Sequence, residues 1–152
     1  MAFSTVEGRE QILDDLAAAI DQIALASACL SAAYEALDVG TADRLEDELY
    51  RPVQRALGRA KRTHGQFAER VALRAPSSEM AEPSLRRLSV KEIIQRAVAS
   101  ASDADRQIGE LQDSMLPIEV GDAELRSGLA EVRELLVVLA GRAPQFLRTL
   151  GR

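Results

Sequence analysis

The chain carries Val39-Gly40-Thr41-Ala42-Asp43 and, 81 residues further on, Val120-Gly121-Asp122-Ala123-Glu124. Each stretch lies between two long segments whose apolar residues recur every three or four positions, as on one face of a helix. Glycine favours the position just past a helix end, and threonine and aspartate favour the N-cap of the next helix. The sequence therefore predicts a tight turn between two helices at each stretch, and so two helical hairpins.

Outward from these turns, the apolar spacing predicts four helices. Ser4 with Glu7, and Ser89 with Glu92, match the capping box that opens a helix. Pro52 falls about three turns into the second helix and predicts a kink or a short break there. The predicted helices cover residues 5–38, 42–74, 89–116 and 123–149.

The expected fold class is all-α: an antiparallel four-helix bundle in up-down-up-down order, within a single domain over residues 1–152. Its core has to be mostly aliphatic, since 47% of the residues are hydrophobic, 3% are aromatic and none is Trp. Residues 75–88 hold Pro76 and Pro83, show no sustained period and are interpreted as the linker between the hairpins. A linker of this length also allows a crossover, which would change the order of the helices.

The repeated turn has two explanations. One is duplication of an ancestral hairpin, which is favoured by the match of Ile12-Leu13 to Ile93-Ile94 at the same offset of 81 residues. The other is convergence, because any helical hairpin favours these turn residues. The sequence leaves both open.

His64, the only histidine, falls on the inward-facing stripe of the second helix. Counting along the predicted helices sets it level with Ala97 and Ala101 of the third helix. A layer of such small side chains either leaves a ligand cavity oriented by His64 or lets the helices pack closely, and native cores favour close packing. Gly58 and Gly65, on a flank of the second helix, predict a close approach of another helix.

The sequence predicts no cofactor, no metal site and no catalytic residues. A carboxylate-bridged di-iron bundle needs Glu-x-x-His on two helices, whereas the residue three before His64 is Lys61. Haem attached through Cys-x-x-Cys-His, or held by two histidines, is excluded by the single Cys29 and the single histidine. The hairpin register sets Cys29 roughly 20 Å from His64 along the bundle, too far for a nucleophilic pair.

Positive charge gathers on the second helix. Residues 51–74 hold seven bases against one acid, whereas residues 7–48 hold eleven acids and two bases. A basic face of this kind suits an acidic protein partner or local ion pairs. The net charge of −5 and the lack of interleaved aromatic residues argue against nucleic acid and against an acidic membrane. The candidate partner-binding residues are Arg51, Arg55, Arg59, Arg62 and Arg70.

The first helix is apolar on more than one face. It has no charged residue between Gln22 and Tyr34, and Ala19, Ala26 and Ala33 form a second stripe beside its main apolar seam. Since a bundle helix buries only one side, this stripe predicts a self-association surface and a homodimer. Asp21 interrupts the apolar run, which argues against a membrane span.

The leading functional hypothesis is a non-enzymatic module for protein interaction or structure that associates with itself. The alternative is a small-ligand-binding bundle with His64 in the alanine-lined layer. A cavity beside His64 would favour the second hypothesis, and a continuous apolar patch on the first helix would favour the first. A single cysteine and the absence of a signal-peptide pattern predict a cytoplasmic protein, and arginine outnumbers lysine by 17 to 2, as in GC-rich bacteria.

Overall fold

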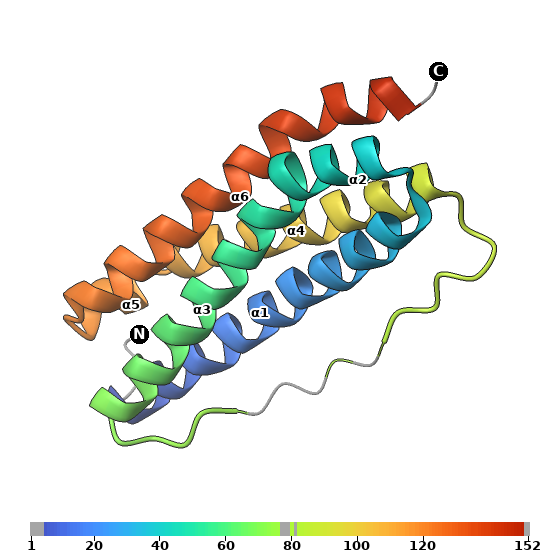
Figure 1. The fold of residues 1–152 in the computed structure, drawn as a ribbon. Coiled ribbons are helices and arrows are strands. Elements are labelled where there is room, and N and C mark those ends of the chain that lie inside the picture. Colours follow the sequence, from blue (N-terminus) through green and yellow to red (C-terminus); the bar gives the residue numbers. More distant parts are fainter. Residues whose placement is uncertain (1–4, 77–79, 81, 151–152) are drawn as a thin grey trace.

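The computed structural model describes residues 5–76, 80 and 82–150, and every regular element in these ranges is a helix (Figure 1). The all-helical class is therefore confirmed. Residues 39–70 run as one continuous rod, so four long rods lie side by side. The elements are α1 (Thr5–Ala36), α2 (Val39–Leu45), the π-helical turn η1 (Glu46–Tyr50), α3 (Arg51–Arg70), α4 (Val90–Asp113), α5 (Leu116–Glu119) and α6 (Ala123–Leu150).

The second glycine turn is built as predicted, whereas the first is not. Gly121 has a φ of +69°, in the left-handed region that glycine adopts without strain. Asp122 follows it and caps α6 by accepting a backbone N–H of the first turn at 2.8 Å. In the first stretch the N-cap is Asp38, whose carboxylate accepts the Thr41 N–H at 3.1 Å. Gly40 and Thr41 therefore lie inside α2, and the predicted stop and cap at these two residues are wrong.

The start of α4 follows the predicted capping box. The Ser89 hydroxyl accepts the Glu92 N–H at 3.1 Å, and the Glu92 carboxylate accepts the Ser89 N–H at 3.2 Å. Each group satisfies a backbone donor that has no partner inside the helix. The other predicted capping box depends on Ser4, which lies outside the described residues.

α3 ends at Arg70, earlier than the predicted end at residue 74. Ala72 takes a φ of +55°, and the Leu73 N–H reaches back to the Ala68 carbonyl at 3.0 Å. The left-handed residue thus lets the Ala68 carbonyl at the end of α3 accept a hydrogen bond, and the chain leaves the helix at this point. An alanine holds the position that glycine usually fills, so no turn residue in the sequence indicates the stop.

The short break predicted at Pro52 does not occur, and the helix instead has the π-helical turn η1 before the proline. Pro52 has no N–H to donate to the Glu48 carbonyl, and η1 ends just before it. Arg142 of α6 donates instead to the Asp47 and Glu48 carbonyls, at 3.5 and 3.4 Å. The rod therefore continues past the proline with its freed carbonyl contacted by a neighbouring helix.

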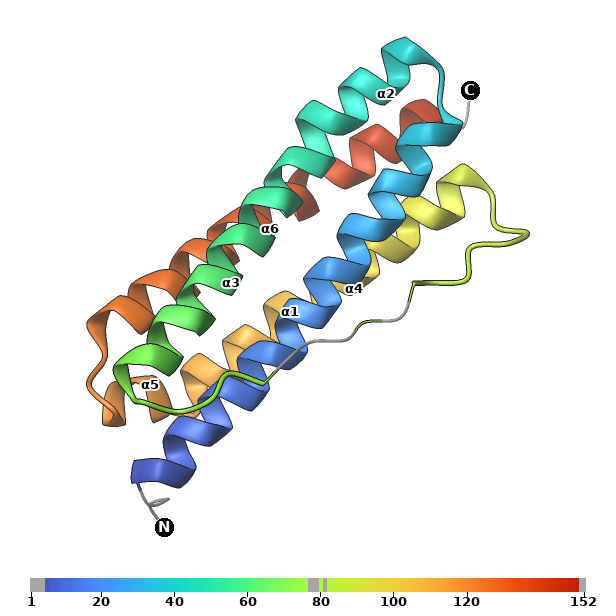
Figure 2. The same cartoon turned by 60° about the horizontal axis from the view of Figure 1, so that its bottom comes forward.

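The helices do not run in the predicted up-down-up-down order. α1 packs against α3 and α4, and α6 packs against the same two helices. Figure 2 shows α4 descending beside α1 and parallel to α3, with α6 rising, so the order is up-down-down-up. The side-chain register agrees: on α4, Arg96 interacts with Cys29 of α1, and Glu110 interacts with Asp15.

The connection between α3 and α4 is long enough to allow this order of the helices. The chain leaves α3 beside the start of α6 and re-enters α4 beside the end of α1, at the opposite end of the molecule (Figure 1). Residues 71–89 extend to roughly 60 Å at about 3.3 Å per residue, which exceeds the roughly 36 Å length of α4. The crossover that the linker allowed is the arrangement observed.

The alanine stripe of α1 lies inside the molecule. Ala19, Ala26 and Ala33 each have 0% exposure and belong to the core. α1 packs most extensively against α4, whose Ala97 and Ala101 are also buried, because small side chains on both helices let the backbones approach. The stripe therefore cannot form the predicted dimer surface: α1 is buried on two sides within one chain.

One helix, Val6–Ala36, is long and apolar enough to cross a membrane by length and composition alone. Half of its most apolar stretch is buried inside the protein. The core helix of a water-soluble bundle has the same properties, since it has to be apolar on every side that meets another helix.

Candidate functional site

His64 lies on the inner side of α3, as predicted, and is 7% exposed. Its Nε2 atom lies 3.0 Å from the Leu13 carbonyl of α1. Because a carbonyl only accepts, Nε2 carries the proton and donates, which leaves Nδ1 as an acceptor in the neutral ring. Among the described residues Nδ1 has no hydrogen-bond partner.

A groove of about 470 Å³ opens beside His64, between α1, α3 and the linker. We call it the His64 groove. Its apolar floor consists of the lining residues on α1, and α3 contributes Lys61, His64 and Gly65. Pro76 and Met80 of the linker also line it. The three floor residues are Ala17, Ile20 and Ala24.

Ala97 and Ala101 do not line this groove, so their prediction as ligand-binding residues is wrong. They are 0% and 2% exposed in the core. The predicted topology set the start of α4 level with His64, but the crossover carries it to the other end of α1. Ala97 therefore lies near the level of Cys29, whereas His64 is bonded to Leu13.

Gly65 marks the groove, although its place in the sequence predicts close helix packing. No heavy atom lies within 4 Å of the position that a Cβ at Gly65 would occupy. At Gly58 the nearest neighbour of such a Cβ is Arg62 of the same helix, at 3.6 Å. Glycine on a helix flank signals either a neighbour or an empty space, and the sequence does not distinguish them. The lining residues Pro76 and Met80 lie in the linker, where no periodicity indicates what they contact.

Cys29 is buried with 0% exposure, and burial raises the pKa of its thiol, against a smaller lowering by Arg96. Along α1 it lies 16 residues beyond Leu13, the residue bonded to His64, which corresponds to about 24 Å. The thiol and the imidazole therefore lie apart, as the register predicted.

Three of the five candidate arginines, Arg51, Arg59 and Arg70, form ion pairs within the chain. Arg51 pairs with Asp47 at 2.9 Å, and Arg59 turns toward α6, where it pairs with Glu131 at 2.6 Å. Arg55 and Arg62 are exposed, and no ion pair of theirs is found within the described part of the chain. The predicted continuous arginine row is therefore reduced to these two residues.

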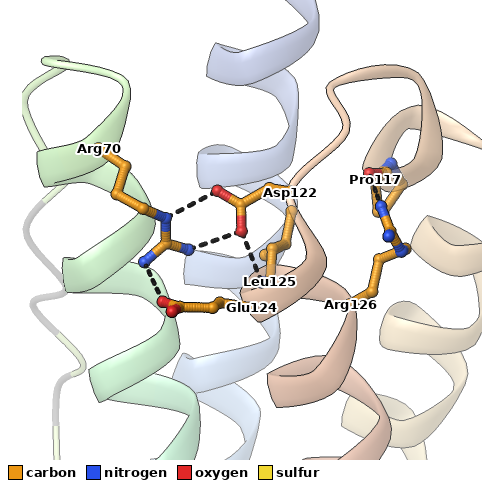
Figure 3. Close-up of polar contacts among 6 residues, drawn as sticks. All are labelled: Arg70, Pro117, Asp122, Glu124, Leu125 and Arg126. Atoms are coloured by element: carbon orange, nitrogen blue, oxygen red, sulfur yellow. Dashed lines mark hydrogen bonds and ion pairs between the residues drawn. The ribbon is translucent and has the colours of Figure 1, made fainter.

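Arg70 closes the end of the molecule where α3 meets α6 (Figure 3). Its Nε and Nη2 atoms donate to the two oxygens of Asp122, both at 2.8 Å, and its Nη1 donates to Glu124 at 3.1 Å. Burial raises the pKa of Asp122, but hydrogen bonds from Arg70 and the α6 backbone, with the Arg70 charge, lower it overall. Beside this cluster, Arg126 donates to the Pro117 carbonyl at 3.4 Å. Arg70 is thus a structural clamp in this chain.

Within the described ranges, no three His, Cys, Asp or Glu side chains come together as a possible metal site. Comparisons of the chain with protein-family models, with curated proteins and with solved structures found no match. The function therefore has to be inferred from the geometry of the chain itself.

Proposed function

We propose that this protein is a non-enzymatic, cytoplasmic four-helix bundle that binds a small molecule in the His64 groove. The observation that carries the proposal is an open groove of about 470 Å³ with one titratable ring at its side and an apolar floor. Small-molecule sites are typically concavities of roughly 300–1,000 Å³, mostly apolar, with a few polar groups. The groove has this size, and its lining combines apolar residues of α1 with the polar side chains of Lys61 and His64.

Two features favour ligand binding over the protein-interaction hypothesis. The first is the cavity beside His64, which distinguishes a ligand-binding bundle from an interaction module. The alanine stripe, which was the main argument for self-association, is part of the core. The described lining residues include neither a carboxylate nor a thiol, which supports binding rather than catalysis.

Gly65 provides a direct test. In Gly65→Leu the new side chain occupies the empty space in the groove, and leucine favours a helix over glycine, so folding is retained. The control is Gly141→Leu on α6, where a Cβ also has no neighbour within 4 Å. A small-molecule library is screened by amide chemical shifts of the ¹⁵N-labelled protein.

The proposal predicts hits that shift the amides of Ala17 and Gly65, that still bind Gly141→Leu and that no longer bind Gly65→Leu. A library without any hit at these amides would contradict it. So would hits that bind Gly65→Leu with unchanged affinity, since they would occupy another site.

A second candidate function is supported by Arg55 and Arg62, which lie seven residues apart on one face of α3 and are exposed. Two cations at this spacing, without an ion pair in the described ranges, suit an acidic protein segment. Titration with a glutamate-rich peptide should shift the amides around both residues in a salt-dependent way, and Arg55→Glu with Arg62→Glu should abolish the shifts. Stronger salt-dependent binding to duplex DNA than to the peptide would point to nucleic acid instead.

A further inference from the structure

We infer that the ligand of the His64 groove is a small amphipathic carboxylate, with its hydrocarbon part on α1 and its carboxylate at Lys61. The inference rests on the proposed function and adds the chemical class of the ligand. It follows from the floor, from the one charge among the described lining residues and from the hydrogen bond of the imidazole.

The floor of the groove is an apolar strip along α1. Ala17, Ile20 and Ala24 are spaced by three and four residues, so they share one face of the helix over about 10 Å. Met80 of the linker also lines the groove, and a methionine side chain adapts to irregular apolar shapes. A short hydrocarbon chain or ring system laid along this strip is removed from water where it packs against α1.

Lys61 is the one charged residue among the described residues that line the groove. Within the described part of the chain it has neither an ion pair nor a side-chain hydrogen bond, although six of the chain's arginines pair with acids. Its ammonium offers three donors on a flexible stem that can lie along the apolar floor. An anionic head group completes this arrangement, whereas a cationic one is repelled by it.

The hydrogen bond of His64 indicates which of the two polar side chains on α3, Lys61 or His64, binds the carboxylate. Nε2–H is committed to the Leu13 carbonyl and is not available to a ligand. The Lys61 ammonium therefore supplies the N–H donors from which a carboxylate accepts. Nδ1 is left to accept from a hydroxyl of the ligand or from a bridging water.

The test compares three probes that share an eight-carbon chain and differ in the head group: octanoate, 1-octanol and octylammonium. Isothermal titration calorimetry measures their dissociation constants for the wild-type protein, Lys61→Gln, Lys61→Arg and Gly65→Leu. We expect octanoate to bind at least about tenfold more tightly than octanol, and octylammonium to bind more weakly than octanol. Lys61→Gln should reduce octanoate binding to the level of octanol, whereas Lys61→Arg keeps the preference.

The outcomes separate the two proposals. Equal binding of octanoate and octanol, a preference for octylammonium, or an unchanged octanoate affinity in Lys61→Gln would overturn the carboxylate assignment. If Gly65→Leu still abolishes binding in these cases, the groove remains the ligand site. Binding of the probes that Gly65→Leu leaves unchanged would overturn both proposals, whereas no binding by any probe would overturn the carboxylate assignment alone.

Discussion

At the residue scale, the tightest constraint is the contact between α3 and α6 at Gly128. A Cβ at this position would overlap the Thr63 side chain, whose hydroxyl also accepts a hydrogen bond from Arg59 at 3.2 Å. Thr63 is 2% exposed and cannot move aside without losing core contacts. Glycine is therefore required here by the neighbouring helix rather than by the backbone conformation.

Gly128→Ala should lower the free energy of unfolding by about 1–2 kcal/mol, because overpacking outweighs the better helix propensity of alanine. Gly141→Ala, on the same helix with no neighbour near its Cβ, is the control and should raise it by about 0.5–1 kcal/mol. Urea denaturation followed by circular dichroism measures both. A gain in stability for Gly128→Ala would show that α3 and α6 are further apart at this point.

The Arg70 clamp makes stability depend on pH. Because the pKa of Asp122 is lower in the folded chain than its ordinary value near 3.9, its ionised form contributes stability above that value. The contribution is lost as the pH falls toward the folded pKa, where the carboxylate is protonated.

Asp122→Asn removes the charge and keeps a good N-cap. We expect this variant to unfold about 1 kcal/mol more easily than wild type above pH 5, with a difference that shrinks toward pH 3. Asp103→Asn, which alters an exposed pair with Arg106 at 3.5 Å, is the control and should change stability by less than about 0.5 kcal/mol. A difference for Asp122→Asn that stays constant from pH 7 to pH 3 would exclude an ionic contribution.

At the scale of single elements, the helices were largely predictable and their ends were not. Periodicity located all four rods, because the apolar residues must face one core. Ser89 and Asp122 could be recognised as caps because no neighbouring residue suits the N-cap as well. Asp38 was missed because it precedes Gly40 and Thr41, which match the usual turn chemistry equally well. The end of α3 was missed because Ala72 gives no sign of a left-handed φ.

Ala72 offers a test of this element boundary. An L-residue in the left-handed region costs roughly 1 kcal/mol relative to glycine, and the Ala72 side chain is exposed. Ala72→Gly should therefore raise the free energy of unfolding by about 0.5–1 kcal/mol. The exposed Ala140 within α6 is the control, since Ala140→Gly should lower it by a similar amount. Destabilisation by both substitutions would mean that α3 continues past residue 72.

At the scale of the whole molecule, the sequence predicted the number of rods but not their order. Both topologies bury the same stripes, so periodicity cannot choose between them. The same ambiguity affects the candidate site. Periodicity correctly predicts that His64 lies on the inner face of its helix, but the prediction that Ala97 and Ala101 lie beside it depended on the direction of α4. The alanine stripe of α1 was misassigned for a related reason, since an apolar second face signals a second neighbour without saying whether that neighbour is in the same chain.

A spin label tests the order of the helices. Gln95 is exposed near the start of α4, and Gln95→Cys in a Cys29→Ala background provides a single attachment site. The observed topology predicts paramagnetic broadening of amides near Leu30 of α1. The up-down-up-down order predicts broadening near Leu13, about 25 Å further along the helix. The pattern of broadened amides therefore decides between them.

The burial of the alanine stripe also changes the expected oligomeric state. We expect a monomer of 16.5 kDa in sedimentation velocity over a wide range of concentrations. Val137 and Val138 on α6 are the adjacent exposed hydrophobic residues that a dimer would cover, at 59% and 39% exposure. A concentration-dependent dimer that Val137→Glu dissociates would contradict the monomer and locate the interface on α6.

The crossover between α3 and α4 has a consequence during synthesis on the ribosome. The helix against which α1 packs most extensively is α4, which is translated only after α2, α3 and the linker. Until then, a long alanine- and leucine-rich helix has a partner on one side only, and its other apolar face is open to water. At about 5–20 residues per second, this interval lasts several seconds. We expect the nascent chain to be a chaperone client during that time, and a chain that stops at residue 75 to aggregate rather than fold as a hairpin.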